Sequence, residues 1–345
     1  MSKMTTILTL DQADAWRAIL QRYGVADVYY EPGYLLPLAR RGEGEPQLFV
    51  YEEGEAFGVH VVLRRPLATL PFAHPYADRF DTISPYGYAG PLINHEAHAG
   101  AMWDAWREQA RLLGIVAEFI RFHPLQKNYR PFAEHIETQT LSQTVWIDLT
   151  GDIEEQLNKN NRRDQRHSHR DGLRAERVDA QYIPAFGKMY RDTMRKCDAD
   201  DYYFFADEYF HSLAAGLGEG FQLWRAHVGD VDCGYTLYLR HGPYLHYHLS
   251  CSNPAKRHLR STNYLLVQGS RRAKMEGCRQ FHLGGGYRGN DSLFAFKANF
   301  SPHRADFVIG RFTHDERVVA ELTRLAHEAG QAPAANFFPP YRSGR

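Results

Sequence analysis

The stretch QLWRAHVG, residues 222–229, followed by GYTLYLR, residues 234–240, is the most informative about the fold of this chain, because its pattern occurs twice. Its counterpart in the first half is QLFVYEEG, residues 47–54, followed by GVHVVLR, residues 58–64. Each pair is a run of strand-forming residues, a glycine turn and a second such run, which predicts a β-hairpin. A hairpin repeated in the two halves indicates two copies of one folding unit.

A second repeated pattern follows each hairpin. A predicted helix ends at Gly114 and is followed by a strand over residues 115–122; another ends at Gly277 and is followed by a strand over residues 278–283. Glycine directly after a helix is a common helix stop. The shared order of helices, hairpin, further strand, helix and strand predicts an α+β layer fold in each half.

The chain length fits two domains rather than one, because 345 residues exceed an ordinary single core. We expect an N-terminal domain over residues 1–150, a basic helical segment over 151–178 and a C-terminal domain over 179–312. A tail over 313–345 could pack back on the first domain or stay loose. The oligomeric state is left open.

Composition excludes several classes of protein. Hydrophobic residues make up 43% of the chain, which argues against wholesale disorder. The formal net charge is zero, so any nucleic-acid contact must come from a local basic patch. The first ten residues lack a signal-peptide layout, and no apolar run reaches the roughly 20 residues that span a bilayer. Four separated cysteines without a C-x-x-C motif favour reduced thiols, a cytoplasmic protein and no metal site.

A basic stripe lies between the two halves. Its members recur every three or four residues and therefore share one face of a predicted helix: Lys159, Arg163, Arg166, Arg170 and Arg174. Such a stripe is either a solvated helix face or a contact for an anionic ligand, such as a phosphate or an RNA backbone.

The segment HLGGGYRGNDSLFAFKANF, residues 282–300, is the most specific in the chain. A predicted strand ends in three glycines, and a short helix with Phe296, Lys297 and Phe300 follows. Glycines at a strand end allow the backbone to approach a ligand closely, although a flexible loop has the same composition.

This segment resembles the closing signature of the Fem family: three glycines, then Asp-Ser-Leu-Phe-x-Phe-Lys-x-x-Phe. The runs SNPAKRHLR, residues 252–260, and NYLL, residues 263–266, resemble the preceding loop and helix. The basic stripe lies where that family has a basic helix. The likeness covers residues 140–310 well. The first half matches more loosely, and SPYGYAGP, residues 84–91, looks like the broader Fem-related group labelled acetyltransferases.

The resemblance implies two tandem GNAT domains that transfer an amino acid from aminoacyl-tRNA, as co-substrate, to an amine. Lys297 maps to the family lysine near the reactive end of the donor, and Phe296 to its aromatic neighbour. The further donor-binding candidates are Arg257, Arg260, Ser261 and Asn263, and the candidate tRNA or anion contacts are Lys159, Arg163, Arg166 and Arg170. A peptidoglycan precursor, a small natural product and a sugar amine remain open as acceptors.

The alternative donor is an acyl-CoA, which GNAT enzymes bind through a glycine-containing loop at a helix N-terminus. The only match to that loop, residues 21–26, follows a helix and precedes a strand, which is the wrong context. At the expected place in the second half, no glycine occurs between Gly242 and Gly269. The sequence therefore favours tRNA over CoA. A CoA-dependent N-acyltransferase and a non-catalytic binding module remain as alternatives.

The expected reaction is attack of an amine on an ester carbonyl. Lys297 suits stabilisation of the resulting oxyanion, or binding of the donor's terminal phosphate. Asp291 is the nearest motif carboxylate, and it is equally suited to cap the short helix. The acceptor candidates are Tyr86 and Tyr88 in the first half and Tyr247 and His248 in the second, with packing as the alternative role of each. His246 and His248 alternate on a predicted strand and so share one face.

Overall fold

The computed structural model describes residues 3–25, 27–286, 289, 291–331 and 337–343. The chain forms two compact units. The first contains Met1–Val25, Leu38–Leu141 and Phe307–Arg345, and the second contains Ala26–Pro37 and Ser142–Asp306. The units therefore differ from a simple division near residue 150. A short N-terminal segment belongs to the second unit, and the chain returns to the first within its last long strand.

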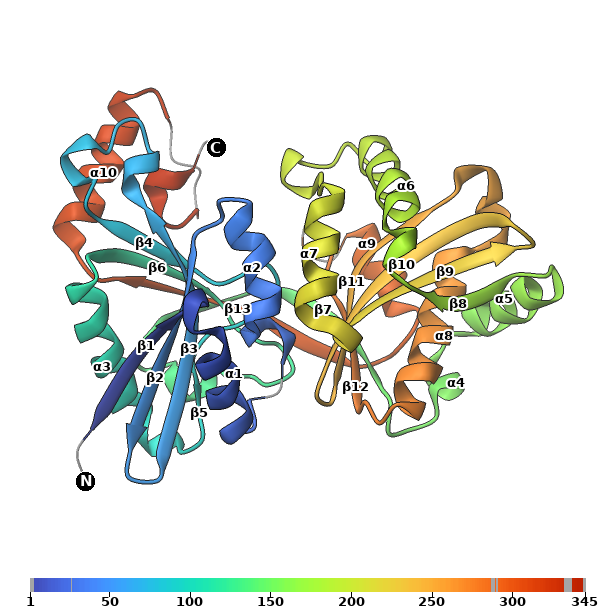
Figure 1. The fold of residues 1–345 in the computed structure, drawn as a ribbon, viewed down its shortest axis with the longest axis horizontal. Helices are drawn as coiled ribbons and strands as arrows, with labels where there is room; N and C mark the ends of the chain where they lie inside the picture. The colour runs from blue at the N-terminus through green and yellow to red at the C-terminus, as the bar shows by residue number, and fades with distance from the viewer. Residues whose placement is uncertain (1–2, 26, 287–288, 290, 332–336, 344–345) are drawn as a thin grey trace. The chain divides into compact units, whose positions relative to one another are not determined.

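The first unit is a mixed sheet with helices. Its strands follow the order β1 (Met4–Thr9), β2 (Glu45–Glu53), β3 (Ala56–Pro66), β4 (Phe80–Ile83), β6 (Ile115–Arg121) and the end of β13 (Arg304–Thr313), and β5 (Leu92–Ile93) pairs with β3. The strands β4 and β6 pair in parallel, and α3 (Ala99–Leu112) lies between them in the sequence. The helices α1 (Ala13–Arg22) and α10 (Glu316–Glu328) complete this unit (Figure 1).

The second unit repeats this plan. Its strands follow the order β7 (Glu137–Asp148), β12 (Gln280–Gly284), β11 (Tyr244–Ser252), β10 (Val231–His241), β9 (Phe221–Val228) and β8 (Arg174–Val178). The pair β11 and β12 is parallel and is connected by α8 (Ser261–Met275). Both predicted hairpins are present, as β2–β3 and β9–β10. The glycines after α3 and α8 have positive φ, +70° at Gly114 and +83° at Gly277, as helix stops require.

Helices cover both faces of the second sheet. On one face, α6 (Ile183–Lys196) and α7 (Asp207–Leu217) meet Tyr235, whose ring centroid lies 6.1 Å from that of Phe186. On the other face, α8 packs so closely that a Cβ at Gly269 would lie 2.8 Å from the Tyr238 ring. The remaining helices are α4 (Ile153–Gln156), α5 (Lys159–Arg170) and α9 (Ser292–Ala298), and α2 (Pro32–Arg40) runs from the second unit into the first.

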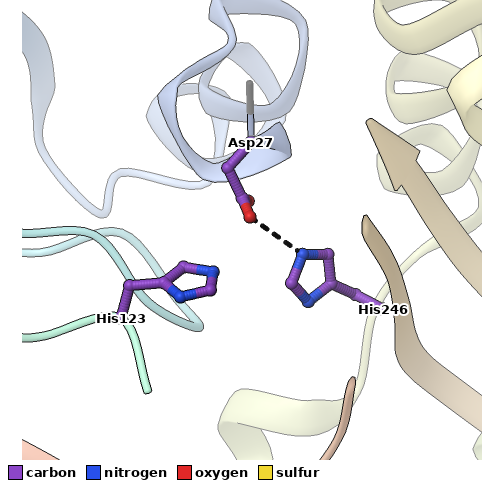
Figure 2. A group of neighbouring side chains, drawn as sticks. All are labelled: Asp27, His123 and His246. Carbon is purple, nitrogen blue, oxygen red and sulfur yellow. Dashed lines mark hydrogen bonds and ion pairs between the residues drawn. The ribbon is translucent and has the colours of Figure 1, made fainter. Parts of the chain in front are cut away.

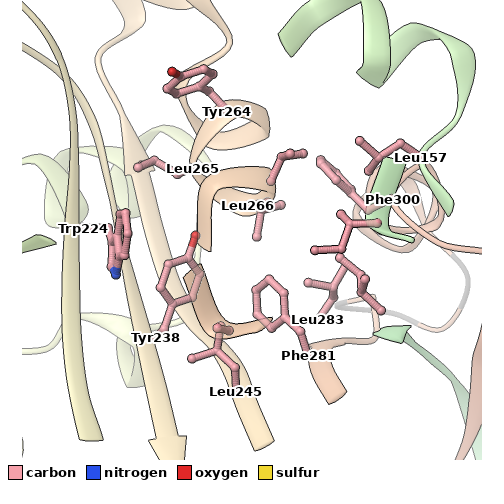
Figure 3. Packing of buried hydrophobic residues seen from close by; sticks show 14 of the residues in the cluster. Leu157, Trp224, Tyr238, Leu245, Tyr264, Leu265, Leu266, Phe281, Leu283 and Phe300 are labelled. Carbon is pink, nitrogen blue, oxygen red and sulfur yellow. The ribbon is translucent and has the colours of Figure 1, made fainter. Parts of the chain in front are cut away.

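A hydrophobic cluster fills the space between α8 and the sheet (Figure 3). Trp224, Tyr238 and Phe281 point from the strands, and Leu265 and Leu266 point from the helix. Phe300 of the quoted motif belongs to the same cluster. Burying one such side chain contributes roughly 1.5–3 kcal/mol, so this core fixes the strands and the motif helix together. The predicted α+β class is confirmed in both units.

The C-terminal segment lies in the first unit. Tyr341 is buried in a cluster with residues of α10, including Val318 and Leu322. The side chain of Arg342 donates to Asp81 at 2.5 Å, and the Tyr341 hydroxyl donates to the same carboxylate at 3.1 Å. These contacts tie residues 340–342 to β4.

Candidate active site

The two parallel strands of the second unit diverge at a defined point. The ladder between β11 and β12 pairs Tyr244 with Gln280, Leu245 with Phe281 and His246 with His282, and it ends there. The strand β11 continues to Ser252, while β12 keeps its pairing with β7 as far as Gly284. A gap between two parallel strands exposes backbone groups that a ligand can bind. This gap is the candidate site.

A β-bulge lies directly beside the gap. Tyr238 of β10 pairs with Tyr247, and the neighbouring Leu237 pairs with Leu249, so His248 is the extra residue. A bulge bends its strand and redirects side chains, and bulges are common beside active sites. Here it bends β11 where the ladder to β12 ends.

Lys297 lies between the diverging strand ends. Its Nζ donates to the carbonyl of Gly285, just after β12, at 2.6 Å. The same Nζ lies 5.5 Å from the ring centroid of Tyr247 on β11. Lys297 is only 7% exposed. Burial lowers the pKa of Lys297 to about 8, and the nearby Asp291 carboxylate partly opposes this shift.

The short helix α9 holds this lysine in place. Asp291 is its N-cap, and its carboxylate accepts from the Phe294 N–H at 3.0 Å. Phe296 is half-buried and packs edge-on against Phe300, with 5.3 Å between ring centroids. Asp291 is therefore observed as a helix cap and Phe296 as a packing residue. The motif residues at positions 287, 288 and 290 lie outside the described residues.

The two acceptor candidates on β11 face opposite sides of the sheet. The Tyr247 hydroxyl hydrogen-bonds to Ser250, and its ring packs on the cluster under α8. His248 instead lies 3.4 Å from the Tyr209 hydroxyl and edge-on to Tyr34. The two side chains thus approach the gap from opposite faces.

The face with His248 also carries a buried acid–imidazole pair. Asp27 accepts from His246 Nε2 at 3.1 Å, and both side chains are almost fully buried (Figure 2). His246 shares its face with His248, as the alternation predicts. Burial, together with the nearby His246, lowers the pKa of His248 to about 3, so its imidazole is neutral at physiological pH.

This face also carries Asp27, Tyr29 and Tyr34, none of which was predicted as a site residue from the sequence. Tyr29 lies 4.8 Å from His246, and Tyr34 contacts Tyr29 edge-on. These residues precede their partners by more than 200 positions, as the Asp27–His246 separation of 219 illustrates. Pattern analysis along the sequence has no signal for such a pairing.

The predicted donor-binding residues before and within α8 take part in packing. Arg260 pairs with Asp164 at 2.6 Å, and its φ of 49° is left-handed. The Ser261 hydroxyl donates to the Cys233 carbonyl at 2.8 Å, and Asn263 donates to the Asn161 side chain at 2.9 Å. Arg257 is exposed in a short 3-10 helix.

The predicted basic helix is α5, and its buried and exposed faces carry different kinds of residue. Its buried face is polar: Asn161, Asp164, Gln165 and Ser168. The stripe members Lys159, Arg163, Arg166 and Arg170 are all exposed on the other side. Arg174 lies outside the helix, in β8, because the helix ends before Gly172, whose φ is +84°.

The candidates of the first unit lie after its own parallel pair. The pairing of β4 with β6 ends at Ile83 and Phe119, and Tyr86 and Tyr88 follow. Both are half-buried. The ring of Tyr88 meets Phe307 at 5.5 Å and His123 at 6.1 Å, both edge-on. Burial raises the pKa of Tyr88 above its usual range, so its hydroxyl stays protonated.

An antiparallel meander, a strand–helix–strand crossover and parallel strands that diverge, all present twice, define a tandem GNAT fold. Residues 155–298 match a family model described as the acetyltransferase (GNAT) domain. That match lies within the second unit and includes Lys297. The chain therefore has an acyltransferase fold, with its candidate site where the second unit's strands separate.

Solved structures support the same conclusion about the fold. FemX matches with a TM-score of 0.66 at 12% identity, covering 89% of this chain and 97% of FemX. The lysylphosphatidylglycerol synthetase C-terminal domain from Agrobacterium fabrum matches with a TM-score of 0.55 at 16% identity, over 91% and 94% of the two chains. L-PGS from Bacillus licheniformis matches with a TM-score of 0.57 at 11% identity, over 86% and 90%. The resemblance to the Fem family is confirmed at the level of the fold.

Two negative findings accompany these similarities. A search of curated protein sequences gave no match. Within the part of the chain that the structure describes, no helix has both the length and the apolar character needed to cross a bilayer.

Proposed function

We propose that this protein is an aminoacyltransferase that moves an amino acid from aminoacyl-tRNA to an amine in the cytoplasm. The observation that carries the proposal is the buried Lys297 between the diverging ends of β11 and β12. An ammonium in this position can meet the oxygen on which negative charge develops during acyl transfer. The FemX-like fold and the Fem-type motif around Lys297 support the choice of donor.

The reaction forms one amide bond and breaks one ester bond. The neutral amine attacks the carbonyl carbon of the aminoacyl ester, and the carbonyl oxygen becomes an oxyanion. Lys297 donates to that oxyanion, since one of its three N–H bonds is used by Gly285 and two remain. Collapse expels the ribose oxygen of the tRNA, which takes up the proton that the amine loses, either directly or through water.

The surroundings of α8 support tRNA over CoA as donor. The side chains of Arg260, Ser261 and Asn263 are engaged with Asp164, the Cys233 carbonyl and Asn161. Each would have to give up a contact to bind a pyrophosphate at the start of α8. The name of one structural neighbour, lysylphosphatidylglycerol synthetase, describes a lysyl group joined to a lipid, which is also aminoacyl chemistry.

The acceptor enters from the other face of the sheet in this proposal. His248 and Tyr209 line that face beside the bulge, and a neutral imidazole can accept a hydrogen bond from an amine. A cell-wall precursor, a small natural product and a sugar amine all present such a group. The test is a transfer assay with pools of charged tRNA, run in parallel with acetyl-CoA; transfer from acetyl-CoA alone would contradict the proposal.

A further inference from the structure

A hollow lies between α5 and α8, outside the site described above. Its volume is about 380 Å³. From α5 it is lined by Arg162, Arg166 and His169, and from α8 by Gln268 and Arg271. The spacing on each helix places these residues on one face. This α5–α8 groove shares Arg166 with the basic stripe, and its other lining residues are not stripe members.

The groove carries an excess of positive charge. Three guanidiniums line it, and Glu154 is the only carboxylate, giving a net charge of +2 with His169 neutral. Arg271 pairs with Glu154, while Arg162 donates only to the Glu154 backbone carbonyl at 3.1 Å. Arg166 makes no hydrogen bond or ion pair with any residue that the structure describes. Arg162 and Arg166 therefore have no carboxylate partner among the described residues, and Arg271 keeps N–H groups beyond the one that Glu154 accepts.

A buried amide in the groove requires more of a ligand than negative charge. Gln165 is 6% exposed and lines the groove. Its Nε2 donates to the Asn263 carbonyl at 3.0 Å, which fixes the orientation of the amide. Its Oε1 is buried and has no hydrogen-bond partner among the described residues. A buried acceptor without a donor is costly, so a fitting ligand must bring a hydroxyl or N–H group as well as anionic oxygens.

The groove is connected to the candidate active site through α5. Asn158, the N-cap of α5, donates to the Asn299 side chain at 2.7 Å, and Asn161 donates to the Asn299 carbonyl at 3.1 Å. Asn299 follows the Lys297 helix by one residue. A chain bound along α5 thus leads toward the helix that carries Lys297.

We infer that the α5–α8 groove binds the ribose–phosphate backbone of RNA. RNA supplies phosphate oxygens for Arg162, Arg166 and Arg271, and its 2′-hydroxyl supplies the donor that Gln165 lacks. The inference deepens the proposed function, because it gives the donor tRNA a place to bind. An anionic membrane would also attract arginines, but a concave groove with a buried amide fits a chain better than a flat surface.

The test measures binding of an uncharged RNA hairpin with a single-stranded 3′ end, by fluorescence anisotropy between about 50 and 200 mM salt. The variant is Arg162→Gln/Arg166→Gln/Arg271→Gln. We expect Kd to rise at least about tenfold and the salt slope to fall by roughly two to three units. The matched control, Lys188→Gln/Arg195→Gln/Lys196→Gln, removes three exposed charges from α6 of the same unit and should change Kd by less than about threefold. A DNA hairpin of the same sequence should bind the wild type more weakly.

Equal effects of the two triple variants would overturn the inference, because the charge would then act without the groove. So would groove-dependent binding to phosphatidylglycerol vesicles without RNA binding. Uncharged RNA keeps this result separate from the proposed reaction: transfer can fail while RNA binding in the groove holds, and the reverse. Melting temperatures of all variants establish that they are folded.

Discussion

Lys297 is the residue on which the chemistry depends. It is buried without a close carboxylate partner among the described residues, an arrangement that costs stability and is uncommon for lysine. A surface ion pair would leave this side chain exposed and of little consequence. In the structure, Lys297 is instead buried beside the gap between β11 and β12, where an ammonium can stabilise developing negative charge.

The first prediction is that Lys297→Met lowers transfer at least about tenfold without lowering the melting temperature. Methionine keeps the apolar stem and removes the charge. Because folding lowers the pKa of Lys297 to about 8, the ammonium opposes folding at neutral pH, and its removal should not destabilise the protein. Initial rates and thermal melts of both proteins measure this. A variant with full activity would remove Lys297 from the site.

The second prediction concerns pH and the same residue. If the ammonium is the active form, kcat/KM should fall as pH rises through about 8, where Lys297 loses its proton. The residual activity of Lys297→Met should lack this descending limb. A wild-type rate that keeps rising above pH 9 would assign a base role to Lys297 instead.

The third prediction concerns Glu118, which is buried in the first unit. Its carboxylate meets His60, His314 and the Trp106 N–H. Burial raises the pKa of Glu118, but the two histidines outweigh it and hold the pKa at about 2. A depressed carboxyl pKa stabilises the fold above the unfolded value near 4.5 and ceases to do so as pH falls toward 2.

Wild type should therefore lose up to about 3 kcal/mol of unfolding free energy between pH 4.5 and pH 2 through this group. Glu118→Gln should be less stable at pH 6 and should lose less over that interval. Denaturant titrations across the range test this, with the exposed Glu316→Gln as a control that follows wild type. Parallel curves for Glu118→Gln and wild type would show that the histidines do not hold this carboxyl charged.

At the scale of elements, the short helix α9 sets the position of Lys297. Its cap is Asp291, whose carboxylate accepts from the Phe294 N–H. The sequence left two roles open for Asp291, a cap and a carboxylate of the reaction. A substitution that keeps one role and removes the other can separate them.

The fourth prediction is that Asp291→Ser retains most of the transfer rate at neutral pH, whereas Asp291→Ala loses much of it. Serine also caps helices, and loss of a cap costs roughly 0.5–2 kcal/mol. Asp291 partly supports the pKa of Lys297, so its removal should also move the alkaline limb of the rate to lower pH. Rate profiles and melts of the two variants measure this. Equal inactivation of both variants would show that the Asp291 carboxylate takes part directly in the reaction.

Local sequence patterns predicted the helices and strands better than they predicted the contacts between them. Alternation and glycine stops give the hairpins and the helix–strand units because those signals act within a few residues. The three-residue spacing on α5 predicts which cations share a face, but not that its buried face is polar. That face meets the start of α8, where Gln165 and Ser168 bind backbone carbonyls, and such a pairing depends on tertiary structure.

At the scale of the whole molecule, two segments belong to units whose other residues lie far from them in the sequence. Residues 26–37 belong to the second unit although the first surrounds them in the sequence. The C-terminal residues 340–342 lie against β4 of the first unit. Neither placement follows from periodicity, because each rests on a few long-range polar contacts. The repeat, in contrast, was visible because both copies keep the same order of elements.

The fifth prediction is that Asp81→Asn lowers the unfolding free energy by about 3–5 kcal/mol. Asp81 is fully buried and binds Arg65 and Arg342, so its neutralisation leaves the buried Arg342 and the half-buried Arg65 without a counter-charge. Arg342→Met should cost less, because Asp81 keeps Arg65. Chemical denaturation measures both. Similar stability of Asp81→Asn and wild type would mean that the apolar cluster around Tyr341 holds the C-terminus unaided.

Aminoacyl transfer from tRNA is tested most directly with a pool of tRNAs charged with radiolabelled amino acids and a mixture of small amine-bearing metabolites. Wild type and Lys297→Met are assayed side by side. We expect a new amide product with wild type, at least about tenfold less with the variant, and none from labelled acetyl-CoA. Efficient acetyl transfer from acetyl-CoA, with no product from any charged tRNA, would contradict this expectation.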